Sequence, residues 1–179
     1  MAVGGAGPSP TAVRRLVLVR HAEAEPARPR LPDADRPLTP AGRERAAATA
    51  AWLAQGGLDR PDLALVSSAL RAGQTWQAMA AVVDPGTVRE EPALYETSAA
   101  ALVHLLAATP PEVRSLLVVG HEPVLSAAAL ALAGEGSDGA ALARVRAGAA
   151  PACAVVLELD GAWGSLAGST CRLVAHWPG

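Results

Sequence analysis

The stretch RLVLVRHAEAEP, residues 15–26, gives the first indication of the fold. Residues 16–19 are all apolar, which predicts a strand buried on both faces, because a half-exposed strand alternates apolar and polar side chains. The strand ends on Arg20 and His21, which place a guanidinium beside an imidazole. This pair can form a site only if other parts of the chain bring partners to the same end of the strand.

Length, charge and hydropathy limit the classes of protein to consider. The chain has 179 residues, enough for one domain with a substantial core, which we expect over residues 14–179 after a disordered tail at residues 1–13. The net charge is -2 and the signs are mixed along the chain, which argues against a nucleic-acid partner or a membrane surface. The start of the chain lacks the features of a secretory signal, and no apolar run approaches the roughly 20 residues that span a bilayer. We therefore expect a cytoplasmic protein.

Five apolar runs predict strands, and four helical patterns accompany them. The first three runs are continuously apolar, as parallel strands covered on both faces are, and the last two are expected to form an antiparallel edge hairpin. Alternation of strands and helices is typical of an open α/β sheet. The expected strands are residues 16–19, 63–66, 115–119, 154–159 and 171–177, and the expected helices are about residues 40–55, 68–83, 98–108 and 124–133.

Three strand ends carry residues of the same chemistry. In open parallel sheets, ligands bind outside the carboxyl ends of the strands. The first strand ends on Arg20 and His21, the second leads through Ser68 to Arg71, and the third leads to His121. Ser68 as the N-cap of the following helix would place Arg71 beside free backbone N–H groups and the positive end of the helix dipole. We therefore expect an anion pocket at this edge of the sheet.

The residues of this pocket suit the transfer of a phosphoryl group. An arginine fork can bind two phosphate oxygens at once, and a neutral imidazole is a nucleophile toward phosphorus. Arg20, Arg71 and a protonated His121 would stabilise charge on the transferring group while His21 attacks in line. Because side chains supply the positive charge, we expect neither a metal ion nor a cofactor.

Four sequence blocks resemble the histidine phosphatase superfamily, and within it the short bacterial phosphohistidine phosphatases. The blocks are RHAEA (20–24), DADRPLTPAGRERA (33–46), SSALRAGQTW (67–76) and VVGHEP (118–123). The resemblance implies a phosphoglycerate mutase-like fold, a three-layer α/β/α sandwich with a mostly parallel central sheet. It also implies that His21 becomes phosphohistidine, that Arg20 and Arg71 clamp the phosphoryl oxygens, and that His121 stabilises the transferring group. Water would then hydrolyse the phospho-enzyme.

The same resemblance suggests a general acid, and it raises the question of a second anion-binding arginine. The family's acid is usually a glutamate after the second helix, and Glu96 is the candidate here, with Glu90 and Glu91 as weaker ones. Glu96 is otherwise explained as a charge at the N-terminus of the third helix. Arg36 lies in the proline-rich loop of residues 25–37, where it would bind substrate or order the loop.

The expected function is that of a metal-independent phosphatase acting on protein phosphohistidine. A small phosphomonoester, such as a sugar or nucleotide phosphate, is the alternative substrate, and a phosphate-binding module without catalysis is the alternative outside the enzymes. The chain is too short for the insertions of the phosphoglycerate mutases. Cys153 and Cys171 lie in neighbouring expected strands, which would bring them close, and we expect reduced apolar residues rather than a disulfide framework or a metal cluster.

Overall fold

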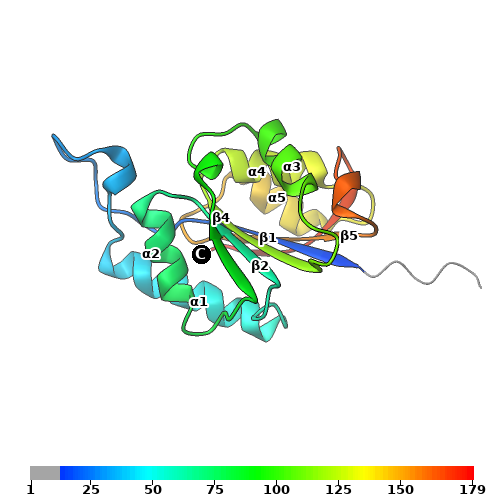
Figure 1. Cartoon of the computed structure of the whole chain (residues 1–179), viewed down its shortest axis with the longest axis horizontal. Helices are drawn as coiled ribbons and strands as arrows, with labels where there is room; N and C mark the ends of the chain where they lie inside the picture. Colours follow the sequence, from blue (N-terminus) through cyan, green and yellow to red (C-terminus); the bar gives the residue numbers. More distant parts are fainter. Residues whose placement is uncertain (1–12) are drawn as a thin grey trace, which may run out of the picture.

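The structure is a computed structural model that describes residues 13–179 and contains a six-stranded sheet between layers of helices (Figure 1). The tail expected at residues 1–13 lies, apart from Val13, outside the described residues. The strands are β1 (Arg14–Arg20), β2 (Leu63–Val66), β3 (Thr87–Glu90), β4 (Ser115–Gly120), β5 (Ala154–Leu159) and β6 (Cys171–Trp177). The helices are α1 (Pro40–Gln55), α2 (Leu70–Met79), α3 (Ala99–Ala107), α4 (Val124–Leu132) and α5 (Gly139–Ala147), with short 3-10 helices at Asp33–Asp35, Pro92–Leu94 and Trp163–Ser165. Within this part of the chain, none of the helices has the length and apolar character needed to cross a membrane.

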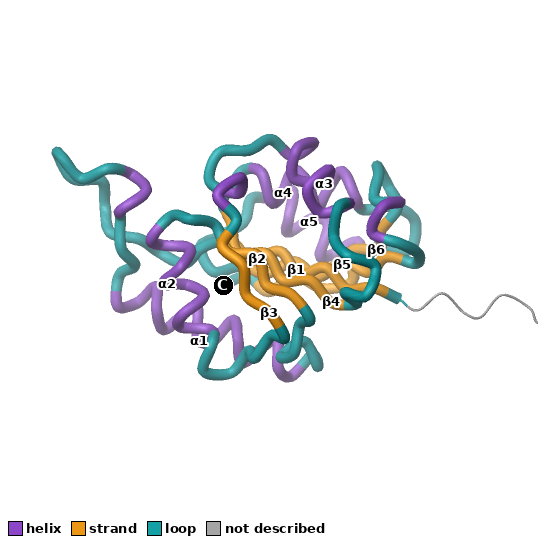
Figure 2. The backbone as a smooth tube through the Cα atoms, in the orientation of Figure 1, coloured by secondary structure: helices purple, strands orange, loops and turns teal. Residues whose placement is uncertain are grey.

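The sheet is mostly parallel and has the strand order β3-β2-β4-β1-β5-β6. β3, β2, β4 and β1 run parallel, whereas β5 is antiparallel to β1 and β6 is antiparallel to β5. Figure 2 shows the strands running side by side through the centre, with helices on both sides. The parallel sheet and the antiparallel edge hairpin are thus both confirmed.

The continuously apolar strands pack against helices on both faces. In β1, Leu16 and Leu18 belong to the core cluster shared with α3, α4 and α5, whereas Val17 and Val19 belong to the cluster shared with α1 and α2. The side chains of β2, β4 and β5 alternate between the two clusters in the same way. Because both faces are covered, consecutive residues of a central strand are all buried, which explains the unbroken apolar runs. This arrangement is the three-layer α/β/α sandwich that the resemblance implied.

Side-chain caps begin two of the helices, α1 and α3, but not the one that carries Arg71. Thr39 caps α1 and Ser98 caps α3, each through its side-chain oxygen. The expected N-cap at Ser68 is wrong, because α2 begins only at Leu70 and the residue before it makes no side-chain cap hydrogen bond. Arg71 is consequently the second residue of α2, still within its first turn.

Two elements, β3 and α5, were not expected. All four residues of β3 are exposed, so this strand lacks the apolar run that would reveal it, and it is held at the sheet edge by parallel pairing with β2. α5 follows the glycine-rich residues 134–139. Asp138 begins it, because its Oδ1 accepts a hydrogen bond from the Ala141 N–H at 2.7 Å.

The two cysteines lie apart, so the expectation that neighbouring strands would bring them close is wrong. The hairpin pairs Leu159 with Cys171 and Ala154 with Trp177, which puts Cys153, just before β5, at the end opposite Cys171. Both thiols are free and buried. They behave as small apolar residues of the core, as the sequence indicated.

Candidate active site

The carboxyl ends of β1, β2 and β4 bring the predicted histidines together. The strand register pairs Arg20 with Gly120, and the His21 N–H donates to the Gly120 carbonyl at 2.9 Å. The ring centroids of His21 and His121 are 5.0 Å apart. In Figure 1 these strand ends lie on the left of the sheet, where the chain between β1 and α1 extends beyond it. Residues 100 positions apart in the sequence therefore share one site.

His21 is held with one ring nitrogen engaged and the other directed at Arg71. Nδ1 lies 2.8 Å from the Ala22 carbonyl oxygen, so it carries the proton and donates it, which leaves a lone pair on Nε2. Arg71 Nε donates to this Nε2 at 3.2 Å. Burial lowers the pKa of His21 to about 4, and the charges of Arg71 and Arg20 add to that effect, although the hydrogen bond to Ala22 opposes it. At neutral pH the ring is therefore a neutral imidazole whose Nε2 lone pair accepts the hydrogen bond from Arg71.

His121 faces the same pocket and is also neutral. Its Nε2 lies 2.8 Å from Ser67 Oγ at the end of β2. Burial lowers the pKa of His121 to about 4, and repulsion by a protonated His21 and by Arg71 adds to that effect. In the free protein, burial and like charges thus disfavour the imidazolium of His121, and the protonated His121 expected during phosphoryl transfer stays a prediction.

Arg71 is the nearly buried cation of the site. Its side chain is 8% exposed, whereas that of Asp33, its ion-pair partner, is 52% exposed. The two terminal nitrogens of Arg71 donate to the carbonyl oxygen of Asp33 at 2.7 Å and to its Oδ2 at 3.0 Å. The Tyr95 ring lies 5.8 Å from the guanidinium carbon, and the Tyr95 hydroxyl donates to Asp33 Oδ2 at 3.2 Å. Loop, helix and strand-end residues thus meet around one guanidinium.

Arg20 approaches the site from β1 and is held by a segment from the last third of the chain. One of its terminal nitrogens donates to the Ala149 carbonyl oxygen at 2.5 Å. Its charge contributes to the lowered pKa of both His21 and His121, so it acts on the pocket that they form. The residues after α5 therefore help to fix a predicted phosphate-binding arginine.

The remaining predicted residues, Glu96 and Arg36, make no hydrogen bond to either histidine in the described part of the chain, and Glu122 follows His121 in the sequence. Glu96 is exposed, and within residues 13–179 its carboxylate makes no hydrogen bond or ion pair, so its role as general acid stays a prediction. Arg36 donates to the Glu25 carbonyl oxygen and to Asp33 Oδ1, each at 2.9 Å, which supports an ordering role in the loop. Glu122 is half-buried and its pKa is raised by burial; its Oε1 accepts from Ser126 Oγ, within the first turn of α4.

Three residues near the pair of histidines were not assigned roles from the sequence. They are Asp33, Tyr95 and Ser67. Asp33 and Ser67 do fall within the family-like blocks, and Tyr95 precedes the candidate acid Glu96. Their positions in the sequence were the only indication of a role at the site. Neither membership in a family-like block nor distance along the chain indicates which of these side chains contacts Arg71.

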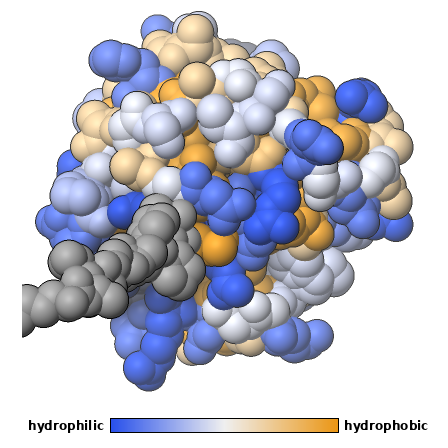
Figure 3. Space-filling model, turned by 90° about the vertical axis from the view of Figure 1, so that its right-hand side faces the viewer, coloured by the Kyte–Doolittle hydropathy of each residue, from blue (hydrophilic) through white to orange (hydrophobic). Residues whose placement is uncertain are grey.

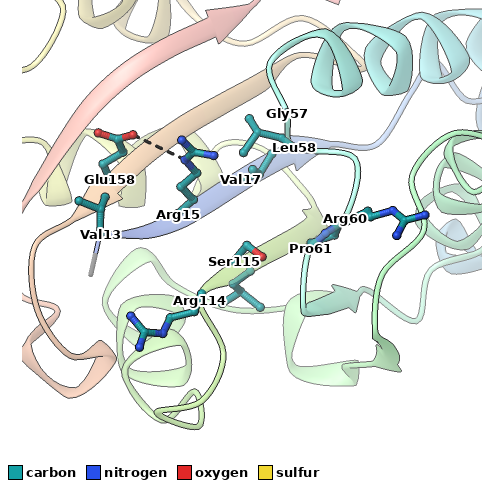
Figure 4. Close-up of a pocket in the computed structure, with 11 residues that line it drawn as sticks. Val13, Arg15, Val17, Gly57, Leu58, Arg60, Pro61, Arg114, Ser115 and Glu158 are labelled. Carbon is teal, nitrogen blue, oxygen red and sulfur yellow. Dashed lines mark ion pairs between the residues drawn. The ribbon is translucent and has the colours of Figure 1, made fainter. Parts of the chain in front are cut away.

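A separate pocket lies at the opposite, amino-terminal end of β1 and β4 (Figure 4). Its volume is about 320 Å³, and Arg15, Arg60 and Arg114 stand around it. Arg15 pairs with Glu158 at 3.6 Å. Figure 3 views the molecule from this end and shows hydrophilic and apolar residues intermixed. Because the two histidines lie at the other end of the strands, this pocket is not part of the candidate active site.

Comparisons with known proteins point to one family. The sequence model of the histidine phosphatase superfamily (branch 1) matches residues 16–102. An uncharacterised protein of Mycobacterium tuberculosis is 34% identical over 148 residues, covering 82% of this chain and 91% of the relative. Among solved structures, a candidate phosphohistidine phosphatase SixA from Nakamurella multipartitia is 33% identical, with a TM-score of 0.80 and coverage of 94% of this chain and 98% of that one. A candidate SixA from Agrobacterium tumefaciens is 31% identical, with a TM-score of 0.77 and coverage of 92% and 97%.

Proposed function

The chain belongs to the histidine phosphatase superfamily and is a phosphatase, and we propose that it acts on protein phosphohistidine through a phosphohistidine intermediate on His21. The observation that carries the proposal is the setting of the His21 ring. Its Nδ1 is bound to the Ala22 carbonyl, its Nε2 lone pair is directed at Arg71, and its lowered pKa keeps it neutral. A fixed ring orientation and a neutral state suit a nucleophilic histidine, and the Arg71 contact places a cation beside the attacking nitrogen, where a phosphoryl group would displace that hydrogen bond.

The reaction proceeds in two displacements at phosphorus. In the first, His21 Nε2 attacks in line, the N–P bond forms, and the bond to the leaving group breaks with its electron pair on that group, which takes up a proton. Arg71 and Arg20 stabilise the charge on the non-bridging oxygens. In the second, water attacks phosphorus and loses a proton, the N–P bond breaks, and inorganic phosphate departs from a regenerated His21.

His121 gains its charge when the phosphoryl group binds. In the free protein its pKa is lowered by burial and then by repulsion from a protonated His21 and from Arg71. The negative oxygens of a bound phosphoryl group offset those charges and favour the imidazolium. A protonated His121 then donates hydrogen bonds, with Ser67 Oγ as the acceptor at Nε2. The protonated state expected from the sequence thus belongs to the complex.

The choice of phosphohistidine as substrate rests on the leaving group. Within the described chain no carboxylate hydrogen-bonds to His21 or His121, since Asp33 is paired with Arg71 and Glu96 is exposed. A phosphoramidate nitrogen is easier to expel than an alkoxide, so it depends less on a general acid. This favours phosphohistidine, with a small phosphomonoester as the alternative.

Acid-labile labelling tests the intermediate. Wild-type protein incubated with a radiolabelled phosphoramidate should acquire acid-labile phosphate, and the H21A variant should acquire none. H21A should also hydrolyse the substrate slower by a factor on the order of 10³ or more. His104, an exposed histidine in α3, provides the matched control, because H104A should label and turn over like wild type. Equal turnover by wild type and H21A would refute the mechanism.

A substrate panel and a chelator test the remaining parts of the proposal. We expect kcat/KM to be highest for a phosphohistidine-bearing protein, lower for phosphoramidate and lowest for a sugar phosphate. A sugar phosphate that exceeds the phosphoprotein would favour the small-molecule alternative. EDTA should leave the rate unchanged because arginine and histidine supply the positive charge, and strong inhibition would contradict the metal-independent mechanism.

A further inference from the structure

Asp33 contacts Arg71 more closely than its position in a surface loop would suggest. It lies in the 3-10 helix Asp33–Asp35, 38 residues before Arg71 in the chain. Its backbone oxygen and its carboxylate both accept hydrogen bonds from Arg71, at 2.7 and 3.0 Å. Among residues 13–179, its carboxylate is the one that forms an ion pair with this nearly buried guanidinium. Asp33 is therefore the counter-charge of Arg71.

The hydrogen bonds divide the guanidinium of Arg71 into two sides. Arginine has five N–H donors in a rigid plane. The two terminal nitrogens bind Asp33, whereas Nε donates to His21 Nε2, the attacking atom. A phosphoryl group seated at that nitrogen would meet the Nε side of the fork. Asp33 thus occupies the end formed by the two terminal nitrogens, and the Nε side, which donates to His21 Nε2 in the free protein, is the side that a phosphoryl group would meet on displacing that hydrogen bond.

Asp33 is itself held in place from two other segments. Arg36 donates to its Oδ1 at 2.9 Å, and Tyr95 donates to its Oδ2 at 3.2 Å. The hydrogen bond from Arg36, followed by the charge of Arg71, lowers the pKa of Asp33 to about 2. The carboxylate is consequently ionised at every pH at which the protein is expected to work. Its position is set by the loop on one side and by the segment before α3 on the other.

We propose that Asp33 is a positioning residue of the phosphatase: it fixes the orientation of Arg71 so that the Nε side of the guanidinium faces His21. The inference rests on the proposed function of His21 and adds a residue to it. An arginine side chain has several rotatable bonds, and ordering it in advance removes that cost from substrate binding and from the transition state. The opposite role is also testable, because a carboxylate that competed with phosphate for Arg71 would weaken substrate binding, and its removal would then improve it.

Kinetics of Asp33 variants distinguish the two roles. We expect D33A to lower kcat/KM for phosphoramidate roughly tenfold to a hundredfold, since small misplacements of a positioned group cost that much. D33N should lose less, because an amide oxygen still accepts from Arg71 but carries no charge. Asp35, exposed in the same 3-10 helix, is the matched control, and D35A should equal wild type. A D33A protein with unchanged or lower KM and undiminished kcat would overturn the proposal.

A double-mutant cycle shows whether Asp33 acts through Arg71. If it does, D33A should cause little further loss in an R71A background, whereas a general structural defect would cause the same fold-loss in both backgrounds. Thermal melts of all variants check that they are folded. H21A separates this inference from the proposed function: an inactive H21A beside a fully active D33A would leave the mechanism standing and refute the role of Asp33. An active H21A would refute the mechanism itself.

Discussion

The acid side of the pH profile is the sharpest consequence of the site geometry. At pH 5.5, the ratio of protonated to neutral imidazole is roughly ten to one for an ordinary histidine with a pKa of 6.5. For His21, with its pKa lowered to about 4, the neutral form exceeds the protonated form by roughly thirty to one at the same pH. Between pH 7.5 and 5.5 an ordinary nucleophile would therefore lose about tenfold in kcat/KM. The buried His21 should cause no such loss over the same range, because it titrates only near pH 4, and uptake of a proton by His121 on phosphoryl binding should make kcat/KM rise as pH falls.

NMR titration of the imidazole C–H resonances measures the underlying protonation directly. H21A and H121A variants assign the two signals, which we expect to titrate together near pH 4 as a coupled pair. Added inorganic phosphate should raise the midpoint of His121. The parallel assay is kcat/KM for an aryl phosphate, corrected for protonation of the substrate. A midpoint near 6.5 that disappears in H21A, or a tenfold fall in corrected kcat/KM between pH 7.5 and 5.5, would refute the reasoning.

Further predictions concern close contacts and stability. Gly42→Ala should lower both the melting temperature and the activity, because its Cβ would lie 2.2 Å from a backbone oxygen of the segment after β1. Gly73→Ala should stabilise α2 by about 0.5–1 kcal/mol, because a Cβ there would meet nothing within 4 Å. A G42A protein as stable as G73A would contradict this prediction. Ser67→Ala should lower kcat roughly tenfold, because it removes the hydroxyl that lies 2.8 Å from His121 Nε2. The same change at the exposed Ser68 should have no effect on kcat. An S67A protein with unchanged activity would count against a role for this contact. The free energy of unfolding should decrease as pH falls from 6.5 toward 4, because over that range the unfolded chain protonates the two pocket histidines and the folded protein does not. Denaturant melts at several pH values measure this slope, which should flatten when both histidines are replaced.

The strand ends were predictable because their chemistry is local in sequence. Arg20, His21 and His121 each lie next to an apolar run, and parallel strands carry such residues to one edge of the sheet. β3 was not predictable, since four exposed residues leave no hydrophobic pattern to detect. α5 was hidden by the glycines before it, although Asp138 is a regular N-cap residue.

The partners of Arg71 depend on the folded arrangement. Asp33 and Asp35 are alike in type and neighbours in sequence, and only the backbone of the 3-10 helix decides which one reaches the guanidinium. Tyr95 likewise joins the site across the full width of the parallel sheet. The charge of His121 is also a property of the fold, because burial and neighbouring positive charges set its pKa. Sequence indicated the reacting groups, and tertiary contacts determine their orientation and protonation.

The two thiols at opposite ends of the β5–β6 hairpin provide built-in probes of local opening. Burial raises the pKa of Cys153 to about 11 and also raises that of Cys171, so little reactive thiolate exists while either end is closed. A maleimide would therefore modify each thiol at the rate at which its own end of the hairpin frays. The Cys153 carbonyl accepts the backbone N–H of Arg20 at 3.1 Å, so labelling there follows the opening of the strand end that carries the nucleophile. Labelling at Cys171 follows the far end of the same hairpin, and the ratio of the two rates compares motion beside the site with motion away from it.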